Sequence, residues 1–138
     1  RFSLLYTLLT RLRREPRLIE DQADPLVRRL ETMAKGVRRD IHKMRAFLRF
    51  REVAEDDGTS RYVAWFEPEH HIVRANAAFF VNRFASMRWS ILTPEVSLHW
   101  DGAALSEGPG ATISVACYLV CSARVSCACS RGIVYDVC

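Results

Sequence analysis

The chain has 138 residues, of which 49% are hydrophobic and 26% are charged, and its formal net charge is +4. This composition is typical of one globular domain and excludes a disordered or fibrous chain. No apolar run approaches the roughly 20 residues of a membrane span, so we expect no membrane partner. The sequence starts at Arg1 without a methionine or a secretory signal pattern, which predicts a fragment of a longer cytoplasmic protein.

Two helices are expected in the first third of the chain. Leucines three and four residues apart predict a helix from Phe2 to Leu12, and Pro16 ends it. Asp24 before Pro25 is typical of a helix start, because the carboxylate caps free N–H groups and proline fits the first turn. A long helix follows, with an apolar stripe at Leu26, Leu30, Met33, Val37, Ile41, Met44 and Leu48.

After residue 50 the apolar residues alternate, as in strands. Residues 50–53 and 61–66 flank an acidic turn and predict a β-hairpin. Residues 72–87 predict a helix, and residues 89–92 and 96–100 a second hairpin. Residues 106–110 are expected to form a turn. The order α-α-β-β-α-β-β predicts an α+β fold, with helices packed on short antiparallel hairpins.

The end of the chain differs in composition from the rest. All five cysteines lie there, at Cys117, Cys121, Cys127, Cys129 and Cys138. Their spacing contains no Cys-x-x-Cys pair, which disfavours a zinc or iron–sulfur site, and an odd number disfavours a disulfide framework. The cysteine-free remainder indicates a reducing cytoplasm. We therefore expect a domain over residues 1–112, truncated at its C-terminus, and a non-native or disordered tail over residues 113–138.

Basic residues are concentrated in the long predicted helix and just after it. From Arg28 to Arg51 there are nine basic and two acidic residues, a local charge of 9 − 2 = +7. At about 100° per residue, most of these basic side chains lie opposite or beside the apolar stripe. One arginine guanidinium can bind two phosphate oxygens at once, so this concentration of arginines predicts contact with nucleic-acid phosphates. The predicted nucleic-acid-binding residues are Arg28, Lys35, Arg38, Arg39, His42, Arg45, Arg49 and Arg51.

Both parts of this prediction have an alternative. The basic side chains could instead form a solvated helix face, and we weigh the two readings equally. Phe47 and Phe50 could stack on nucleic-acid bases or pack in the core, and we expect them in the core.

Carboxylates and imidazoles also cluster at residues 67–71. Adjacent histidines on a turn point apart and lack the i, i+4 spacing of a helical zinc motif, so we expect no metal and no cofactor. Acidic residues there suit the start of the following helix. His42, Glu67, His70 and His71 are weak candidates for acid–base catalysis, but no nucleophile lies at a recognisable spacing, and whether the intact protein is an enzyme stays open.

The chain resembles a bacterial DNA-metabolism domain of unknown function. The matching stretches are residues 1–6, 38–52, 62–73 (YVAWFEPEHHIV), 79–94 and 99–102. In that family the domain often sits N-terminal to a uracil-DNA glycosylase-like, uracil-DNA-binding domain, and related copies are encoded beside a radical SAM protein. The resemblance implies DNA, that glycosylase-like domain and the radical SAM protein as partners. It assigns no catalytic residue.

These observations predict a DNA-binding accessory domain of a uracil-DNA glycosylase-type repair protein, which contacts phosphates through a basic helix. The first alternative is an enzyme that acts on DNA or nucleotides through histidine and glutamate acid–base chemistry. The second is a protein-docking domain for a repair partner. Phosphate binding depends steeply on salt, whereas docking through an aromatic surface does not.

Overall fold

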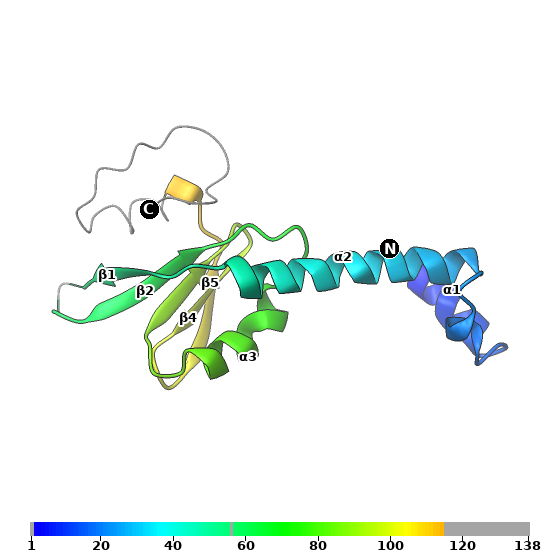
Figure 1. Cartoon of the computed structure of the whole chain (residues 1–138), viewed down its shortest axis with the longest axis horizontal. Coiled ribbons are helices and arrows are strands. Elements are labelled where there is room, and N and C mark those ends of the chain that lie inside the picture. The colour runs from blue at the N-terminus through cyan, green and yellow to red at the C-terminus, as the bar shows by residue number, and fades with distance from the viewer. Residues whose placement is uncertain (1, 56, 115–138) are drawn as a thin grey trace.

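The structure is a computed structural model that describes residues 2–55 and 57–114, and its helices and strands confirm the α+β class (Figure 1). The predicted tail begins at residue 113, so its cysteines and nearly all of it lie outside the described residues. In chain order the elements are α1 (Phe2–Leu12), a 3₁₀ turn η1 (Leu18–Glu20), α2 (Pro25–Phe47), β1 (Arg51–Ala54), β2 (Ser60–Trp65), α3 (Val73–Arg83), β3 (Trp89–Leu92), β4 (Val96–Trp100) and β5 (Leu105–Pro109).

Helix α1 has the predicted bounds, and α2 begins at the predicted Asp24-Pro25. Oδ1 of Asp24 accepts hydrogen bonds from the backbone N–H groups of Leu26 and Val27, at 2.8 and 3.2 Å, which confirms the predicted cap of α2. Nη2 of Arg11 lies 2.8 Å from Oδ2 of Asp24. This contact lowers the pKa of the Asp24 carboxyl and ties the end of α1 to the start of α2.

The five strands form one sheet in the order β1-β2-β3-β4-β5. Both predicted hairpins are confirmed as antiparallel pairs. The sequence did not predict how the two hairpins join: β2 and β3 pair in parallel, so the sheet is mixed and not purely antiparallel. Their connection contains α3, and parallel neighbours need a long crossover of this kind. Helix α3 ends at Arg83, earlier than the predicted residue 87.

The turn predicted at residues 106–110 is also wrong. Residues of β5 pair with β4 along its length, from Trp100 opposite Leu105 to Val96 opposite Pro109. The turn lies earlier, where Oδ1 of Asp101 accepts from the backbone N–H groups of residues 103 and 104 and Gly102 has a φ of 99°. Asp-Gly is a hairpin signal, so the sequence contained the information for this third hairpin.

The core lies between one face of the sheet and the helices α2 and α3. Phe50 is confirmed in it, with ring centroids 5.2 Å from Phe84, 6.0 Å from Trp89 and 6.4 Å from Phe80. Phe47 is not in the core, since 57% of its surface is exposed. The buried apolar residues of the core are Met44, Leu48, Ala64, Ile72, Val73, Ala77, Phe80, Trp89, Ile91, Val96 and Leu98.

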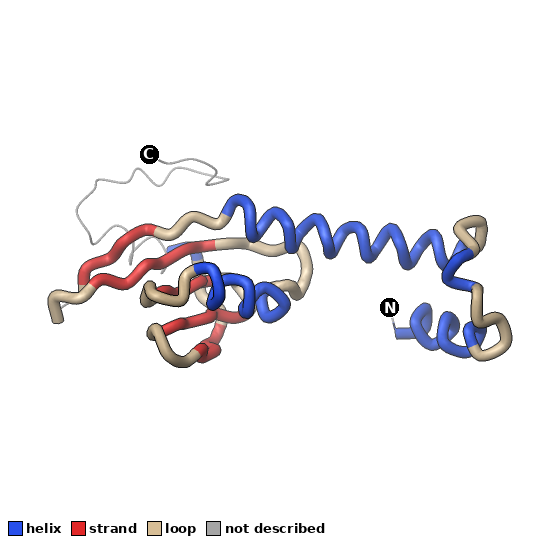
Figure 2. The backbone as a smooth tube through the Cα atoms, turned by 60° about the horizontal axis from the view of Figure 1, so that its bottom comes forward, coloured by secondary structure: helices blue, strands red, loops and turns tan. Residues whose placement is uncertain are grey.

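Helix α2 extends beyond the edge of the sheet. Only its C-terminal half packs on the core, and its N-terminal half extends away from the sheet with α1 folded back beside it (Figures 1 and 2). One flank of this helix is exposed to solvent in the part of the chain that the structure describes, and this flank carries the candidate site.

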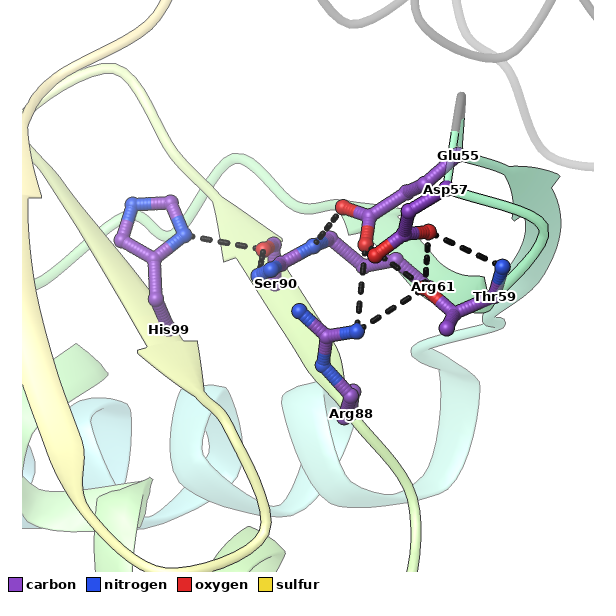
Figure 3. A network of polar contacts seen from close by, with 7 residues as sticks. All are labelled: Glu55, Asp57, Thr59, Arg61, Arg88, Ser90 and His99. Atoms are coloured by element: carbon purple, nitrogen blue, oxygen red, sulfur yellow. Dashed lines mark hydrogen bonds and ion pairs between the residues drawn. The ribbon is translucent and has the colours of Figure 1, made fainter.

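The opposite face of the sheet carries a polar network next to the β1–β2 turn (Figure 3). Nδ1 of His99 lies 2.8 Å from Oγ of Ser90, and Nη1 of Arg61 donates to the same hydroxyl at 3.3 Å. Nε of Arg61 donates to Oε1 of Glu55 at 2.7 Å, and this contact lowers the pKa of Glu55. The network joins β2, β3 and β4 across the sheet.

This network makes the stability of the fold depend on pH. Burial, and second the positive charge of Arg61, lower the pKa of His99 below its ordinary value of 6.5. As the pH falls below that value, the unfolded chain takes up the proton before the folded chain, so stability is lost. We expect His99→Gln to lose less unfolding free energy than the unmodified protein between about pH 7.5 and about pH 5.5. Urea titrations at the two pH values test this, and equal losses in both proteins would contradict it.

Candidate nucleic-acid interface

Five of the predicted nucleic-acid-binding residues form an exposed row on α2, here called the basic ridge: Arg28, Lys35, Arg38, Arg39 and His42. All five side chains are exposed. Within the part of the chain that the structure describes, none of them forms an ion pair or a side-chain hydrogen bond. Their donors are therefore available to a ligand, as phosphate binding requires.

The two acidic residues of the basic segment lie at different places relative to the basic ridge. Asp40 is only 3% exposed and points to the other flank of α2, where its Oδ2 accepts a hydrogen bond from the backbone N–H of His70 at 2.8 Å. Glu31 is the only acidic residue of α2 besides Asp40, and it is partly buried. Glu31 is one helical turn from Arg28 and Lys35, and the pKa of Glu69 is lowered first by Lys43 and less by the charge of Arg39. The basic ridge keeps a net positive charge beside these two carboxylates.

The three remaining predicted residues hold other positions. Nε of Arg45 donates to Oδ1 of the buried Asn76 at 2.7 Å, and its guanidinium lies 4.7 Å from the centre of the Phe79 ring, so Arg45 links α2 to α3. Nη1 of Arg49 donates to the carbonyl oxygens of residues 46 and 48, which closes the C-terminal end of α2. Arg51 is exposed on the edge strand β1. Their contribution to nucleic-acid binding stays a prediction.

Phe47 adds an aromatic ring at the end of α2. It lies one turn after Lys43, on the same flank of the helix. Nζ of Lys43 lies 2.9 Å from Oε1 of Glu69. An exposed ring beside a basic helix is the combination that proteins use to stack an unpaired base.

The structure places the four acid–base candidates in different parts of the molecule. His70 and His71 line one cavity of about 360 Å³, together with Val37, Pro68, Glu69, Ile72 and Glu95. These lining residues do not include His42, which belongs to the basic ridge, or Glu67, whose Oε1 accepts a hydrogen bond from Trp65 Nε1 at 3.2 Å.

Each histidine of the cavity has a carboxylate partner. Nδ1 of His70 lies 3.3 Å from Oδ2 of Asp40, and Nδ1 of His71 is paired with Oε2 of Glu95. A Cβ on Gly36 would lie 3.4 Å from His70 Nε2, which is an ordinary contact distance, so the imidazole packs beside α2 at this position. Sequence reasoning missed both carboxylates, because they are 30 and 24 residues away from their histidines.

Metal ligands do not gather in this region. Within residues 2–55 and 57–114 no group of three or more His, Cys, Asp or Glu side chains could hold a metal ion. The expected absence of a metal and of a cofactor stays a prediction.

The described residues thus define an α+β domain with a mixed five-stranded sheet and a basic helix on its surface. The chain belongs to a family described as a domain of unknown function (DUF4130), whose model matches residues 1–128. The match extends beyond the boundary expected at residue 112, and that boundary stays a prediction. No significant match was found among curated proteins or solved structures. In the described part of the chain, no helix has both the length and the apolar character to cross a membrane.

Proposed function

We propose that this domain binds the phosphate backbone of DNA through the basic ridge and serves as an accessory domain of a uracil-DNA glycosylase-type repair protein. The observation that supports this proposal is that five exposed basic side chains follow one flank of α2 and form no ion pair or side-chain hydrogen bond within the described residues. Contacts of this kind position DNA without reading its sequence.

The length of the basic ridge suits this role. From Arg28 to His42 the helix rises by about 21 Å, at 1.5 Å per residue. A strand of B-DNA has one phosphate per about 3.4 Å of axis, so this length faces enough phosphates for every basic side chain. The proposal therefore needs no change in the described fold.

The accessory role rests on the resemblance described above. A uracil-DNA glycosylase-like domain in the same chain would perform the chemistry, and a radical SAM protein would be a second partner. Tethering such a domain to a phosphate-binding module raises the local concentration of its substrate. This division of tasks needs no catalytic residue in the basic ridge.

The test is the salt dependence of the affinity for duplex DNA, measured by fluorescence anisotropy. Four to five phosphate contacts predict a slope of about −4 in a plot of log affinity against log salt concentration. A slope near zero would contradict the proposal and would favour the protein-docking alternative, which rests on apolar contacts.

Phe47 gives the domain a means to prefer single strands. We expect Phe47→Ala to weaken binding to single-stranded DNA by roughly 5- to 100-fold, since stacking on one aromatic ring contributes about 1–3 kcal/mol. Duplex binding should change little, because paired bases are already stacked. Phe47→Tyr, which keeps the ring, is the control. Equal effects of Phe47→Ala on single strands and duplexes would show that stacking is not its role.

Acid–base chemistry on DNA or nucleotides is a second candidate function. The specific observation is that His70 and His71 line the same cavity and that each is paired with a carboxylate, an arrangement that orients an imidazole for proton transfer. Turnover of a DNA or nucleotide substrate that is lost in His71→Asn, with unchanged DNA affinity, would support it. If the unmodified chain converts none of a panel of such substrates, this candidate fails.

A further inference from the structure

Helix α1 is apolar on two sides. Its first side faces α2, because Leu4, Leu8 and Arg11 share one stripe and Arg11 bonds to Asp24 at the start of α2. Its second side is a separate stripe with the spacing i, i+3, i+4 and i+7, and its members have large exposed fractions. They are Phe2 (90%), Leu5 (49%), Tyr6 (71%) and Leu9 (62%), here called the α1 patch.

The position of α1 leaves its second side without a partner within the described fold. Helix α1 contains no buried residue, and its hairpin with α2 extends away from the sheet (Figure 2). A helix that faces solvent on one side would normally carry polar residues there. Contiguous exposed apolar patches of this kind mark interaction sites.

We propose that the α1 patch is an interface between two copies of this chain, packed antiparallel about a two-fold axis near Leu5 and Tyr6. This inference rests on α1 and is independent of the proposed function. In such a dimer the two α1 helices pack against each other, and each keeps its own α2 on its other side. An interface of this symmetry uses the same patch on both copies, so the patch must be its own complement.

Charge favours a second copy and the antiparallel direction. Residues 2–10 contain no charged residue, so two α1 patches can meet without burying a charge. Arg13 and Arg14 follow just after α1. In an antiparallel pair these arginines lie at opposite ends of the interface, whereas a parallel pair would bring four of them together.

The area is sufficient for a reversible dimer. An aromatic side chain offers about 150–250 Å² and a leucine somewhat less, so the four exposed side chains contribute roughly 500 Å² per copy. Standard interfaces bury about 800 Å² per partner, and small ones less than 600 Å².

Sedimentation of the full 138-residue chain over a range of concentrations tests this inference. We expect twice the monomer mass at high concentration, a shift to the monomer on dilution, and no loss of the dimer at high salt. Leu5→Glu with Leu9→Glu should stay monomeric throughout. Thr7→Glu, which places a charge on α1 outside the α1 patch, should still form the dimer.

Hydrogen exchange gives a second readout that needs no substitution. In the dimer, the amides of α1 should exchange more slowly as the protein concentration rises. A wild-type chain that stays monomeric at every concentration would overturn the proposal, as would a Leu5→Glu, Leu9→Glu variant that still forms the dimer. A monomer that binds lipid vesicles or another protein through the α1 patch would overturn it as well.

Discussion

Replacing Arg28, Lys35, Arg38 and Arg39 with glutamine in one variant is expected to weaken duplex DNA binding on the order of 1,000-fold at about 0.1 M salt. Each phosphate contact contributes about 0.9 to the salt slope, so the four substitutions should reduce its magnitude by about 3.6. Counterion release contributes little to the affinity near 1 M salt and more as the salt concentration falls. The difference in slope between the two proteins therefore becomes a large difference in affinity at about 0.1 M salt. Anisotropy titrations at several salt concentrations measure both quantities.

A second variant separates local from overall charge. Arg13, Arg14, Arg17 and Arg83 are also exposed, and their replacement by glutamine lowers the formal net charge equally, from +4 to 4 − 4 = 0. We expect this variant to keep most of the affinity. Because the basic-ridge side chains form no ion pair or side-chain hydrogen bond within the described residues, the first variant should also nearly keep its unfolding midpoint. Equal losses of affinity in the two variants would show that DNA responds to net charge and that the basic ridge has no special role.

Gly110→Ala is expected to destabilise the fold by about 3 kcal/mol, at the high end of single substitutions. An added Cβ would lie 2.0 Å from the carbonyl oxygen of Pro94 and 2.6 Å from its carbonyl carbon. Both are backbone atoms of the β3–β4 turn, which cannot rotate away as a side chain can. The chain must therefore shift where Ala111 N–H donates to Thr93 O at 2.9 Å and where Ala111 packs beside Val63 and Leu92.

The neighbouring Gly108 provides the control. A Cβ there would lie 3.1 Å from Nε2 of His99, at the end of a side chain that can move by a few tenths of an ångström. Gly108→Ala should therefore cost clearly less than Gly110→Ala. Urea midpoints of the two variants give the comparison, and a Gly110→Ala midpoint equal to that of the unmodified protein would disprove the close approach.

Elements with a strong local signal could be predicted from the sequence. The leucine spacing of α1, the Asp24-Pro25 start of α2 and the alternating residues of β3 and β4 act through neighbouring residues, and their bounds follow from them. The parallel pairing of β2 with β3 depends on where α3 packs, which no local pattern encodes. Strand β5 was missed for another reason: its Gly108 and Pro109, with Gly110 just after it, resemble a turn and outweighed the Asp101-Gly102 signal.

The candidate site also has features that the sequence could predict and features that it could not. Helical periodicity places the basic side chains on one flank of α2, and the structure places five of the eight predicted residues there without partners among the described residues. Periodicity cannot show that Arg45 is bound by Asn76, which is 31 residues away. It also cannot show that Phe47, at the last turn of α2, lies beyond the edge of the core.

The way α2 leaves the sheet has a consequence for the stiffness of the domain. The Met44 side chain is fully buried in the main core, whereas near Arg28 the helix packs outside that core, on α1 and η1, where Val27 and Leu18 are the buried residues. Regions with few buried contacts open locally at low free-energy cost. The Arg28 end of the basic ridge rests on fewer buried residues than the His42 end, so we expect it to open at a lower free-energy cost. If the domain binds DNA as proposed, the His42 end would fix the direction of the bound strand, and the Arg28 end would let the row of charges adapt to strands of different curvature.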